Sequence, residues 1–449
     1  MKFVHAADLH LDSPLRGLSK QAGVPLDRVR LASRHALSNL VELCVDERAG
    51  LLVIAGDIYD GDWRDYSTGL FFAHQMGRLR EAGVQVAMIR GNHDAASQIT
   101  KSLRLPDNVR ELSSRSPESL CFDDLGLAVH GQSFATRAVL ENLAQSYPER
   151  VPLLLNIGLL HTSINGRPGH EPYAPCSLDM LKSKGYDYWA LGHVHAREVV
   201  CSEPWAIFPG NLQGRHARET GAKGATLVVY DSAGIRSVEA RALDVVRYAH
   251  CELDVSDVVS IDDVLDRVRS ALADEHERCA ERTLGVRLSL RGSTHLHSQL
   301  SADDGVLENA RALAADVAGD SLWIEKLIVA TSAPGSEAEL RQAEGPLADL
   351  LAALRANRSD PAALLELARE LAELRSKLPV ELRDGEDGLR LEDPEFVAAR
   401  LDSVEQLLLS RLVPESRDQA QLSAEPRDQA RLSNVPRGPT RLAPEPRDT

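Results

Sequence analysis

The sequence lacks several features that would place it among membrane or disulfide-rich secreted proteins. It contains no uninterrupted apolar run of about 18 residues, the length that suggests a membrane-spanning helix. Its N-terminal segment lacks the charged, apolar and small-residue zones of a signal peptide. It has only six cysteines and no CxxC pair, a pattern that argues against a zinc–thiolate site and is typical of buried thiols in a reducing compartment. We therefore expect a cytoplasmic protein without a membrane segment.

An excess of positive charge is also missing. The formal net charge is −16, and residues 331–410, with 17 acidic and 9 basic side chains, contribute half of it. This balance excludes a large, uniformly basic surface, which is a common electrostatic mark of nucleic-acid binding. It neither requires nor excludes a DNA partner, because divalent metal ions at a site would add positive charge locally.

A chain of 449 residues is too long for one compact core and suggests two or three domains. Short apolar runs at residues 2–7, 51–55 and 85–89 predict buried strands, and helical patterns at 29–48 and 67–81 lie between them. This order favours a layered α/β fold. Further strands are expected at 127–130, 153–160, 188–191, 206–208 and 225–230. With few helices between them, we expect these strands to build a second sheet packed on the first, completing a domain over residues 1–245.

Three different segments follow this first domain. Residues 246–335 alternate predicted strands and helices and indicate a small α+β domain. Residues 336–411 are rich in Ala, Leu, Glu and Arg and predict two or three helices, with breaks near Pro379 and at residues 384–388. Residues 412–449 repeat loosely every ten residues and are poor in apolar side chains, which predicts a disordered tail; a short docking motif is the functional alternative.

Polar clusters stand directly after the predicted strands of the first domain. They are Asp8-Leu9-His10, Gly56-Asp57-Ile58-Tyr59-Asp60, Gly91-Asn92-His93-Asp94 and Gly192-His193-Val194-His195, together with His161 at the end of its strand. Open α/β sheets bind ligands just beyond the carboxyl ends of their strands. We therefore expect these five strand ends to converge on one site.

The residue types in these clusters fit a pair of divalent metal ions. One carboxylate, that of Asp57, can bridge two ions with its two oxygens. The remaining candidate ligands are Asp8, His10 and His195 for one ion, and Asn92, His161 and His193 for the other. Imidazole and carboxylate ligands without thiolates fit Mn, Fe or Zn. Two such ions can polarise a phosphoryl oxygen and activate water, which predicts phosphoester hydrolysis.

His93 follows a predicted ligand but is expected to face the substrate. There it would stabilise the charged transition state or protonate the leaving oxygen. Each motif alone has an ordinary explanation as a turn or surface feature; the ordered set does not.

Asp12 and Asp94 are expected to be capping or supporting groups. No partner can be inferred for His5, His35, His74 and His130, and His295 and His297 are expected in a solvated loop.

The order DxH, GDxxD, GNHD, H, GHxH resembles the calcineurin-like metallophosphoesterase superfamily over residues 1–245. The resemblance implies a four-layer αββα sandwich with two metal ions at the sheet edge. The segments 8–15, 173–178 and 186–195 resemble SbcD-like DNA repair exonucleases of the YhaO-type branch, as does the small second domain. Asp60 occupies a motif position where some relatives have a histidine, and its role stays open.

The narrower resemblance implies Mn²⁺-dependent cleavage of DNA phosphodiesters and a second domain that contacts DNA. It also implies an SbcC-like or YhaN-like ATPase partner, bound through residues 336–411, and homodimerisation. Three functions are weighed: a DNA exonuclease or endonuclease of the repair type, a phosphodiesterase or phosphatase acting on small phosphate esters, and a DNA-tethering scaffold for an SbcC-like ATPase.

Overall fold

The computed structural model describes residues 1–13, 23–60, 66–96, 103–164, 173–279, 282–302, 305–334, 346–378 and 389–412. The predicted tail beyond residue 412 and the predicted helix breaks near Pro379 and at 384–388 lie outside these residues. The chain forms two compact units, Met1–Pro334 and Gly335–Thr449.

The first unit contains two six-stranded sheets. The strand order of the first sheet is β12-β11-β1-β2-β3-β4, and that of the second is β5-β6-β7-β8-β10-β9. The first sheet consists of β1 (Lys2–Ala6), β2 (Leu51–Ala55), β3 (Gln85–Ile89), β4 (Val109–Glu111), β11 (Gly224–Asp231) and β12 (Gly234–Ala242). The second consists of β5 (Glu118–Phe122), β6 (Leu127–Gly131), β7 (Leu155–His161), β8 (Tyr188–Gly192), β9 (Glu198–Ser202) and β10 (Trp205–Phe208).

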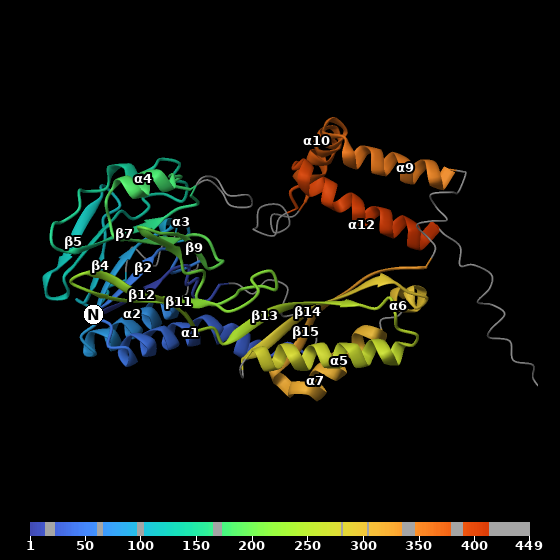
Figure 1. Cartoon of the computed structure of the whole chain (residues 1–449), viewed down its shortest axis with the longest axis horizontal. Coiled ribbons are helices and arrows are strands. Elements are labelled where there is room, and N and C mark those ends of the chain that lie inside the picture. Colours follow the sequence, from blue (N-terminus) through green and yellow to red (C-terminus); the bar gives the residue numbers. More distant parts are fainter. Residues whose placement is uncertain are drawn as a thin grey trace, which may run out of the picture. The chain divides into compact units, whose positions relative to one another are not determined.

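The two sheets are the inner layers of a four-layer sandwich. Helices α1 (Leu26–Asp46) and α2 (Tyr66–Glu81) cover the outer side of the first sheet, and α4 (Leu178–Ser183) lies on the opposite side of the sandwich (Figure 1). Phe3, Val53 and Ile157 belong to the apolar core between the sheets. Strand β2 is buried at every position because both of its faces are covered, which explains its continuous apolar sequence. The predicted α/β class and sandwich are confirmed.

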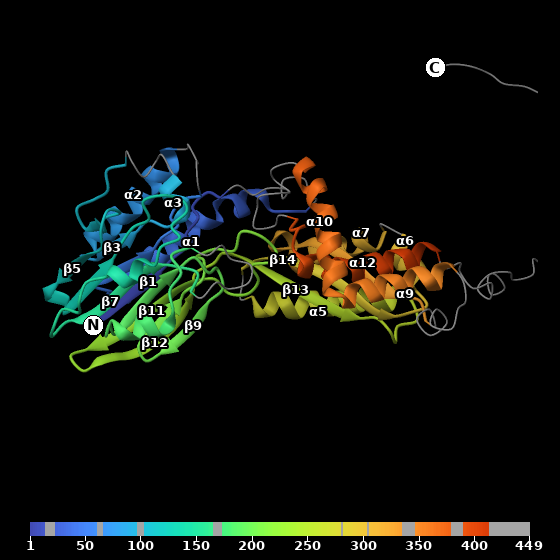
Figure 2. The ribbon, with the colours of Figure 1, turned by 90° about the horizontal axis from the view of Figure 1, so that it is seen from above.

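One strand lies in a different sheet from the one predicted. The segment 225–230 was expected in the second sheet, but β11 pairs antiparallel with β1 in the first, with Val4 opposite Leu227 (Figure 2). An apolar run reports that a strand is buried and does not specify its pairing partner, so this expectation was wrong.

The parallel strands direct their carboxyl ends to one edge of the sandwich. Strands β1, β2 and β3 are parallel neighbours in the first sheet, as are β6, β7, β8 and β10 in the second. Residues of β2 contact both β7 and β8 across the sandwich. The loops that leave these strands are therefore close together in space.

A third sheet follows within the same unit. Its strands β13 (Val246–Asp254), β14 (Thr283–Ser293) and β15 (Leu322–Ser332) are all parallel, and α5 (Ile261–Arg278) and α7 (Gly305–Ala318) cover one face (Figure 1). The short helix α6 (His297–Ala302) was not predicted. His297 begins it and its Nδ1 lies 2.9 Å from Thr331 Oγ1, so the expectation of a solvated loop was wrong for His297, whereas His295 is exposed.

The remaining regular elements are short helices and the helices of the second unit. They are α3 (Asn92–Ala96), three 3₁₀ turns (Asp123–Leu125, Leu143–Ser146 and Gly319–Ser321), and α9 (Pro346–Ser359), α10 (Pro361–Lys377) and α12 (Pro394–Leu412). Each helix of the second unit starts with proline, which is favoured at the first helical position because its missing N–H would have no partner there. Leu364, Ala368, Val397 and Leu401 form their shared core. Within the described residues, no helix is both long enough and apolar enough to cross a membrane.

His5, for which the sequence suggested no partner, is buried in β1 with two partners. Its Nε2 lies 3.2 Å from the Leu191 carbonyl, which only accepts, so Nε2 carries the proton and Nδ1 accepts from the Tyr188 hydroxyl at 3.0 Å. Burial lowers the pKa of His5 to about 3. The ring is therefore neutral in the folded protein around neutral pH.

This shift predicts how stability depends on pH. Between pH 6.5 and 3 the unfolded chain binds a proton at His5 and the folded protein does not, so stability falls as the pH falls through this window. The contribution has a slope of about 1.4 kcal/mol per pH unit. Urea unfolding of EDTA-treated protein between pH 6 and 4 should show a shallower loss for His5→Gln than for the wild type. Parallel profiles would contradict a neutral buried His5.

Candidate metal centre

The seven predicted ligands meet at one edge of the sandwich. His10 Nε2 lies 3.1 Å from His195 Nε2 and 3.9 Å from Asp57 Oδ2. His161 Nε2 lies 3.5 Å from Asp57 Oδ2 and 2.9 Å from Asn92 Oδ1. The His193 amide donates to both oxygens of Asp8, at 3.1 and 3.0 Å. Asp8 in turn lies close to His10 and His195, and the rings of His161 and His193 have centroids 5.2 Å apart. Together these contacts link all seven residues, which the chain supplies from segments up to 187 positions apart.

The backbone at this site adopts an uncommon conformation. Asp8, His10, Asp57 and His193 have φ angles of 50°, 41°, 52° and 100°. Residues with side chains seldom adopt positive φ, and each such residue costs on the order of 1–3 kcal/mol. Strain of this kind clusters at functional sites, where the surrounding structure holds the backbone in place.

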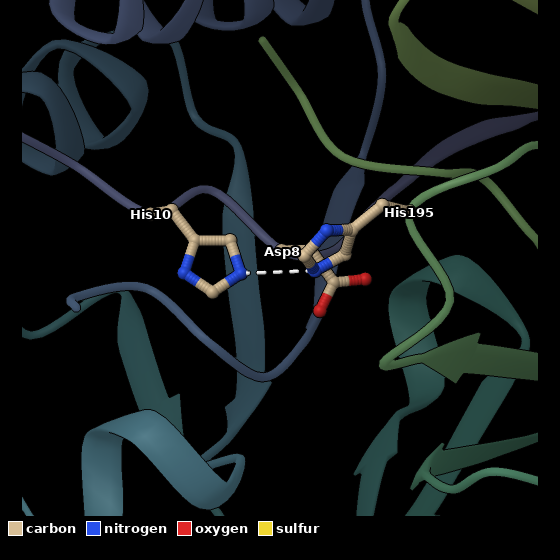
Figure 3. A group of neighbouring side chains, drawn as sticks. All are labelled: Asp8, His10 and His195. Atoms are coloured by element: carbon tan, nitrogen blue, oxygen red, sulfur yellow. Dashed lines mark hydrogen bonds between the residues drawn. The ribbon is translucent and has the colours of Figure 1, made fainter. Parts of the chain in front are cut away.

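Asp8, His10 and His195 form the first group of candidate ligands. Figure 3 shows a ring nitrogen of His10 facing one of His195 beside the Asp8 carboxylate. The other nitrogen of His195, Nδ1, lies 2.8 Å from Glu219 Oε1. Because a carboxylate accepts, Nδ1 carries the proton and Nε2 presents its lone pair to the site. One potential ligand atom from each of Asp8, His10 and His195 lies within 4.8 Å of the other two, a spacing that one cation can span.

Asp8, Asp57 and His161 form a second group with the same spacing. His161 Nδ1 donates to the Ala55 carbonyl at 2.9 Å, which leaves Nε2 as the nitrogen that can act as a ligand. Asp57 belongs to this group and also lies near His10 of the first. Asp8 also belongs to both groups, and the bridging role of Asp57 stays a prediction.

The charge balance of the site suits added cations. Asp57 is buried, and its ion-pair neighbours among the described residues are His10 and His161. Burial lowers the pKa of His10 well below its ordinary value and also lowers that of His161, despite the nearby Asp57. Neutral imidazoles cannot compensate a buried carboxylate, whereas a divalent ion can. The donor set therefore fits two metal ions.

Two glycines permit this close packing. A Cβ on Gly91 would lie 2.2 Å from Asp57 Oδ1 and 2.8 Å from His161 Cε1, so a side chain there would fill the space around these candidate ligands. Gly56 has a φ of 92°, and a Cβ there would lie 2.7 Å from His161 Nδ1. The GD and GN motifs thus require glycine for a steric reason.

His93 lies beside the candidate ligands and is held by Asp60. Its Nδ1 is 2.7 Å from Asp60 Oδ1, and its backbone amide donates to Asp57 Oδ1 at 2.9 Å. Burial works against protonation of His93, but the hydrogen bond to Asp60 and the charges of Asp57 and Asp60 raise its pKa to about 9. Ser13 donates to the second oxygen of Asp60 at 2.5 Å. Asp60 therefore orients the His93 ring, a role that the sequence left open.

Asp94, expected to be a supporting group, holds two of the loops. Its Oδ1 accepts from the amides of Ile58 and Tyr59, both at 2.9 Å, and its Oδ2 accepts from the Gly91 amide at 3.1 Å. Asp12 instead pairs with Arg34 on α1, with a shortest contact of 2.6 Å.

Glu219 is a functional candidate that sequence reasoning missed. Its Oε1 fixes the tautomer and orientation of His195, as described above. Its Oε2 accepts from Asn211 Nδ2 at 2.8 Å and from the Arg215 amide at 2.7 Å. Glu219 follows the carboxyl end of β10 by eleven residues, too far for a motif at the strand end. The charged, glycine-containing stretch 210–224 after that strand was the available signal.

Loss of the Glu219 charge should weaken metal binding. Glu219→Gln keeps the shape of the side chain but reduces its support for the His195 ring, and supporting residues of this kind are typically worth about 10- to 100-fold in metal affinity or activity. Titration of metal-free protein with Mn²⁺ should show this loss for Glu219→Gln and none for the exposed Glu239→Gln. Equal affinity of all three proteins would show that Glu219 does not act on the site.

Comparison with known proteins yields two family matches. The calcineurin-like phosphoesterase family model matches residues 1–197, and the model of the metallophosphoesterase YhaO middle domain matches residues 248–332. The uncharacterized metallophosphoesterase YhaO of Bacillus subtilis is 35% identical over 297 residues, which cover 65% of this chain and 72% of that protein.

More distant proteins match shorter parts. The DNA double-strand break repair protein Mre11 of Methanopyrus kandleri is 27% identical over 271 residues, which cover 53% of this chain and 56% of that protein. The solved structure of a dimetal phosphatase from Danio rerio aligns with 51% of this chain and 92% of its own, at 15% identity and a TM-score of 0.32, too low to bear on the fold.

Proposed function

Because the chain belongs to the calcineurin-like metallophosphoesterases, in the branch that contains YhaO, we propose that it is a metal-dependent DNA nuclease of the repair type. The observation that carries the proposal is the convergence of seven buried or half-buried candidate ligand side chains on one strained edge of the sandwich. The Mre11 relative, named as a DNA double-strand break repair protein, supports DNA as the substrate.

In this proposal, Asp8, His10 and His195 would hold one ion, Asn92, His161 and His193 would hold the other, and Asp57 would be a ligand shared by both. The ions, which we take to be Mn²⁺, would polarise the phosphoryl oxygen and activate water. Asp94 and Glu219 support this arrangement by fixing the loops and the His195 ring.

His93 acts on the substrate in this account. The Asp60 carboxylate contacts Nδ1 of His93, so Nε2 is the ring nitrogen that can interact with the substrate. A protonated ring held next to Asp57 can donate a hydrogen bond to the phosphoryl oxygen, where charge develops, or a proton to the leaving oxygen.

The other segments receive roles by the same reasoning. We assign DNA contact to the domain formed by β13–β15, and binding of an SbcC-like or YhaN-like ATPase to the helices α9, α10 and α12. Cytoplasmic location and homodimerisation belong to the same proposal.

The charges of the β13–β15 domain favour an enzyme over a DNA-tethering scaffold. A scaffold that holds DNA needs cations that are available to phosphates. Every arginine between residues 246 and 332 instead forms an ion pair with an aspartate or glutamate. Strong tethering by this domain alone is therefore not expected.

A substrate comparison tests the proposal. Wild-type protein with Mn²⁺ is assayed on end-labelled linear duplex and single-stranded DNA, on bis-p-nitrophenyl phosphate, and on p-nitrophenyl phosphate. We expect cleavage of DNA and of the diester in preference to the monoester. Turnover of small esters under conditions that leave DNA intact would instead favour the small-ester alternative.

A further inference from the structure

Arg215 is a charged residue next to the metal centre that the proposed mechanism does not use. Its Nη2 lies 3.0 Å from His195 Nδ1 and 3.3 Å from Glu219 Oε1. The other ring nitrogen of His195 is the one that faces His10 and Asp8. The guanidinium therefore contacts one member of the first group of candidate ligands and is about one imidazole width from the other two, His10 and Asp8.

Glu219 fixes this guanidinium in position. It binds Arg215 twice, through the backbone amide at 2.7 Å and through the side chain at 3.3 Å. The side chains of Arg215 and Glu219 are only 13% and 8% exposed, so the ion pair is shielded from solvent. The same segment is anchored by Gln213, whose Nε2 donates to the Val246 carbonyl and whose Oε1 accepts from the Val245 amide at 2.9 Å. A preorganised arginine loses little entropy when it binds an oxyanion.

The positive charge of Arg215 lies close to the candidate ligands of the first ion. Its guanidinium contacts His195, whose opposite ring nitrogen lies 3.1 Å from His10 Nε2. The ion pair with Glu219 offsets the charge of Arg215 beside the two cation sites. A substrate phosphate at these ions would bring further negative charge to the same region, and the planar guanidinium matches its oxygens in geometry.

We infer that Arg215 binds a non-bridging oxygen of the substrate phosphate, next to the ion held by Asp8, His10 and His195, while Glu219 positions the guanidinium. The inference rests on the proposed phosphoester hydrolysis and adds the residue that recognises the phosphoryl group. It assigns the segment 211–219 two tasks: Glu219 supports a metal ligand, and Arg215 contacts the substrate.

The test uses the full-length Mn²⁺-loaded protein with Arg215→Gln, Arg215→Lys and Glu219→Gln, and with the exposed Arg236→Gln as a matched loss of charge. Metal content is measured by mass spectrometry and binding of inorganic phosphate by calorimetry, and kcat and KM are determined with bis-p-nitrophenyl phosphate. Arg215→Gln should keep its metal, bind phosphate about 10- to 100-fold more weakly and raise KM, consistent with loss of one charge-assisted hydrogen bond. Arg215→Lys should recover part of the phosphate affinity, and Arg236→Gln should match the wild type.

Two results would overturn the inference. Unchanged phosphate affinity in both Arg215 variants would exclude phosphate contact. If both Arg215 variants lost as much metal as Glu219→Gln, Arg215 would act only by holding Glu219 in place and would not be assigned a contact with the substrate. The binding measurement separates this inference from the proposed function: weaker phosphate binding in Arg215→Gln upholds it even where the wild type cleaves no DNA, and unimpaired phosphate binding refutes it even where DNA is cleaved.

Discussion

Asp57→Ala is expected to lose both metal ions and to reduce hydrolysis to the background rate. Asp57 lies near candidate ligands of both ions, with Oδ2 at 3.9 Å from His10 Nε2 and 3.5 Å from His161 Nε2. Its Oδ1 also accepts the His93 amide, which fixes the direction of the carboxylate. Removing it takes the proposed shared ligand and a negative charge from a buried site that we propose holds two cations.

Metal content after dialysis against excess Mn²⁺, with hydrolysis of bis-p-nitrophenyl phosphate, measures this effect. Asp60→Asn is the matched control, because it removes a neighbouring carboxylate that contacts His93 and is not a proposed ligand. The control should keep its metal. Normal metal content in a folded Asp57→Ala protein would contradict the bridging assignment.

His93→Ala is expected to keep both metal ions and to lose about 10²- to 10⁴-fold in kcat, the usual contribution of one positioned acid–base group. The metal should remain because the hydrogen bond that His93 makes to Asp57 comes from its backbone amide, and alanine retains that amide. The loss should fall on kcat, since a group that acts on developing charge contributes mainly in the transition state.

The exposed His35→Ala on α1 is the control for His93→Ala and should behave as the wild type. Metal content and steady-state kinetics are measured for both variants. Metal loss in His93→Ala would move His93 into the ligand set, and an unchanged kcat would remove it from the chemistry.

The sequence predicted the site better than it predicted the arrangement of strands. The ligand candidates stand at strand ends, and parallel strands bring those ends to one edge, so local motifs were enough to locate Asp8, Asp57 and His161 together. Strand β11 was assigned to the wrong sheet because pairing partners are a long-range property, and its apolar sequence fits either sheet.

The supporting residues were harder to find for a related reason. Glu219 reaches His195 across 24 positions of the chain, and Asp60 reaches His93 across 33, so neither contact leaves a short motif. The partners of His5 are also distant, at Tyr188 and Leu191. A sequence shows which residue types are present, whereas the tertiary structure decides which carboxylate meets which imidazole.

The electron paramagnetic resonance spectrum of the Mn²⁺-loaded protein distinguishes a dinuclear metal centre from isolated ions. We expect two bound ions per chain with the spectrum of a spin-coupled pair, because Asp57 would be shared by both, and we expect the coupled signal to disappear in Asp57→Ala. Saturation at one ion per chain, or two ions that give only the spectrum of isolated Mn²⁺, would contradict this expectation.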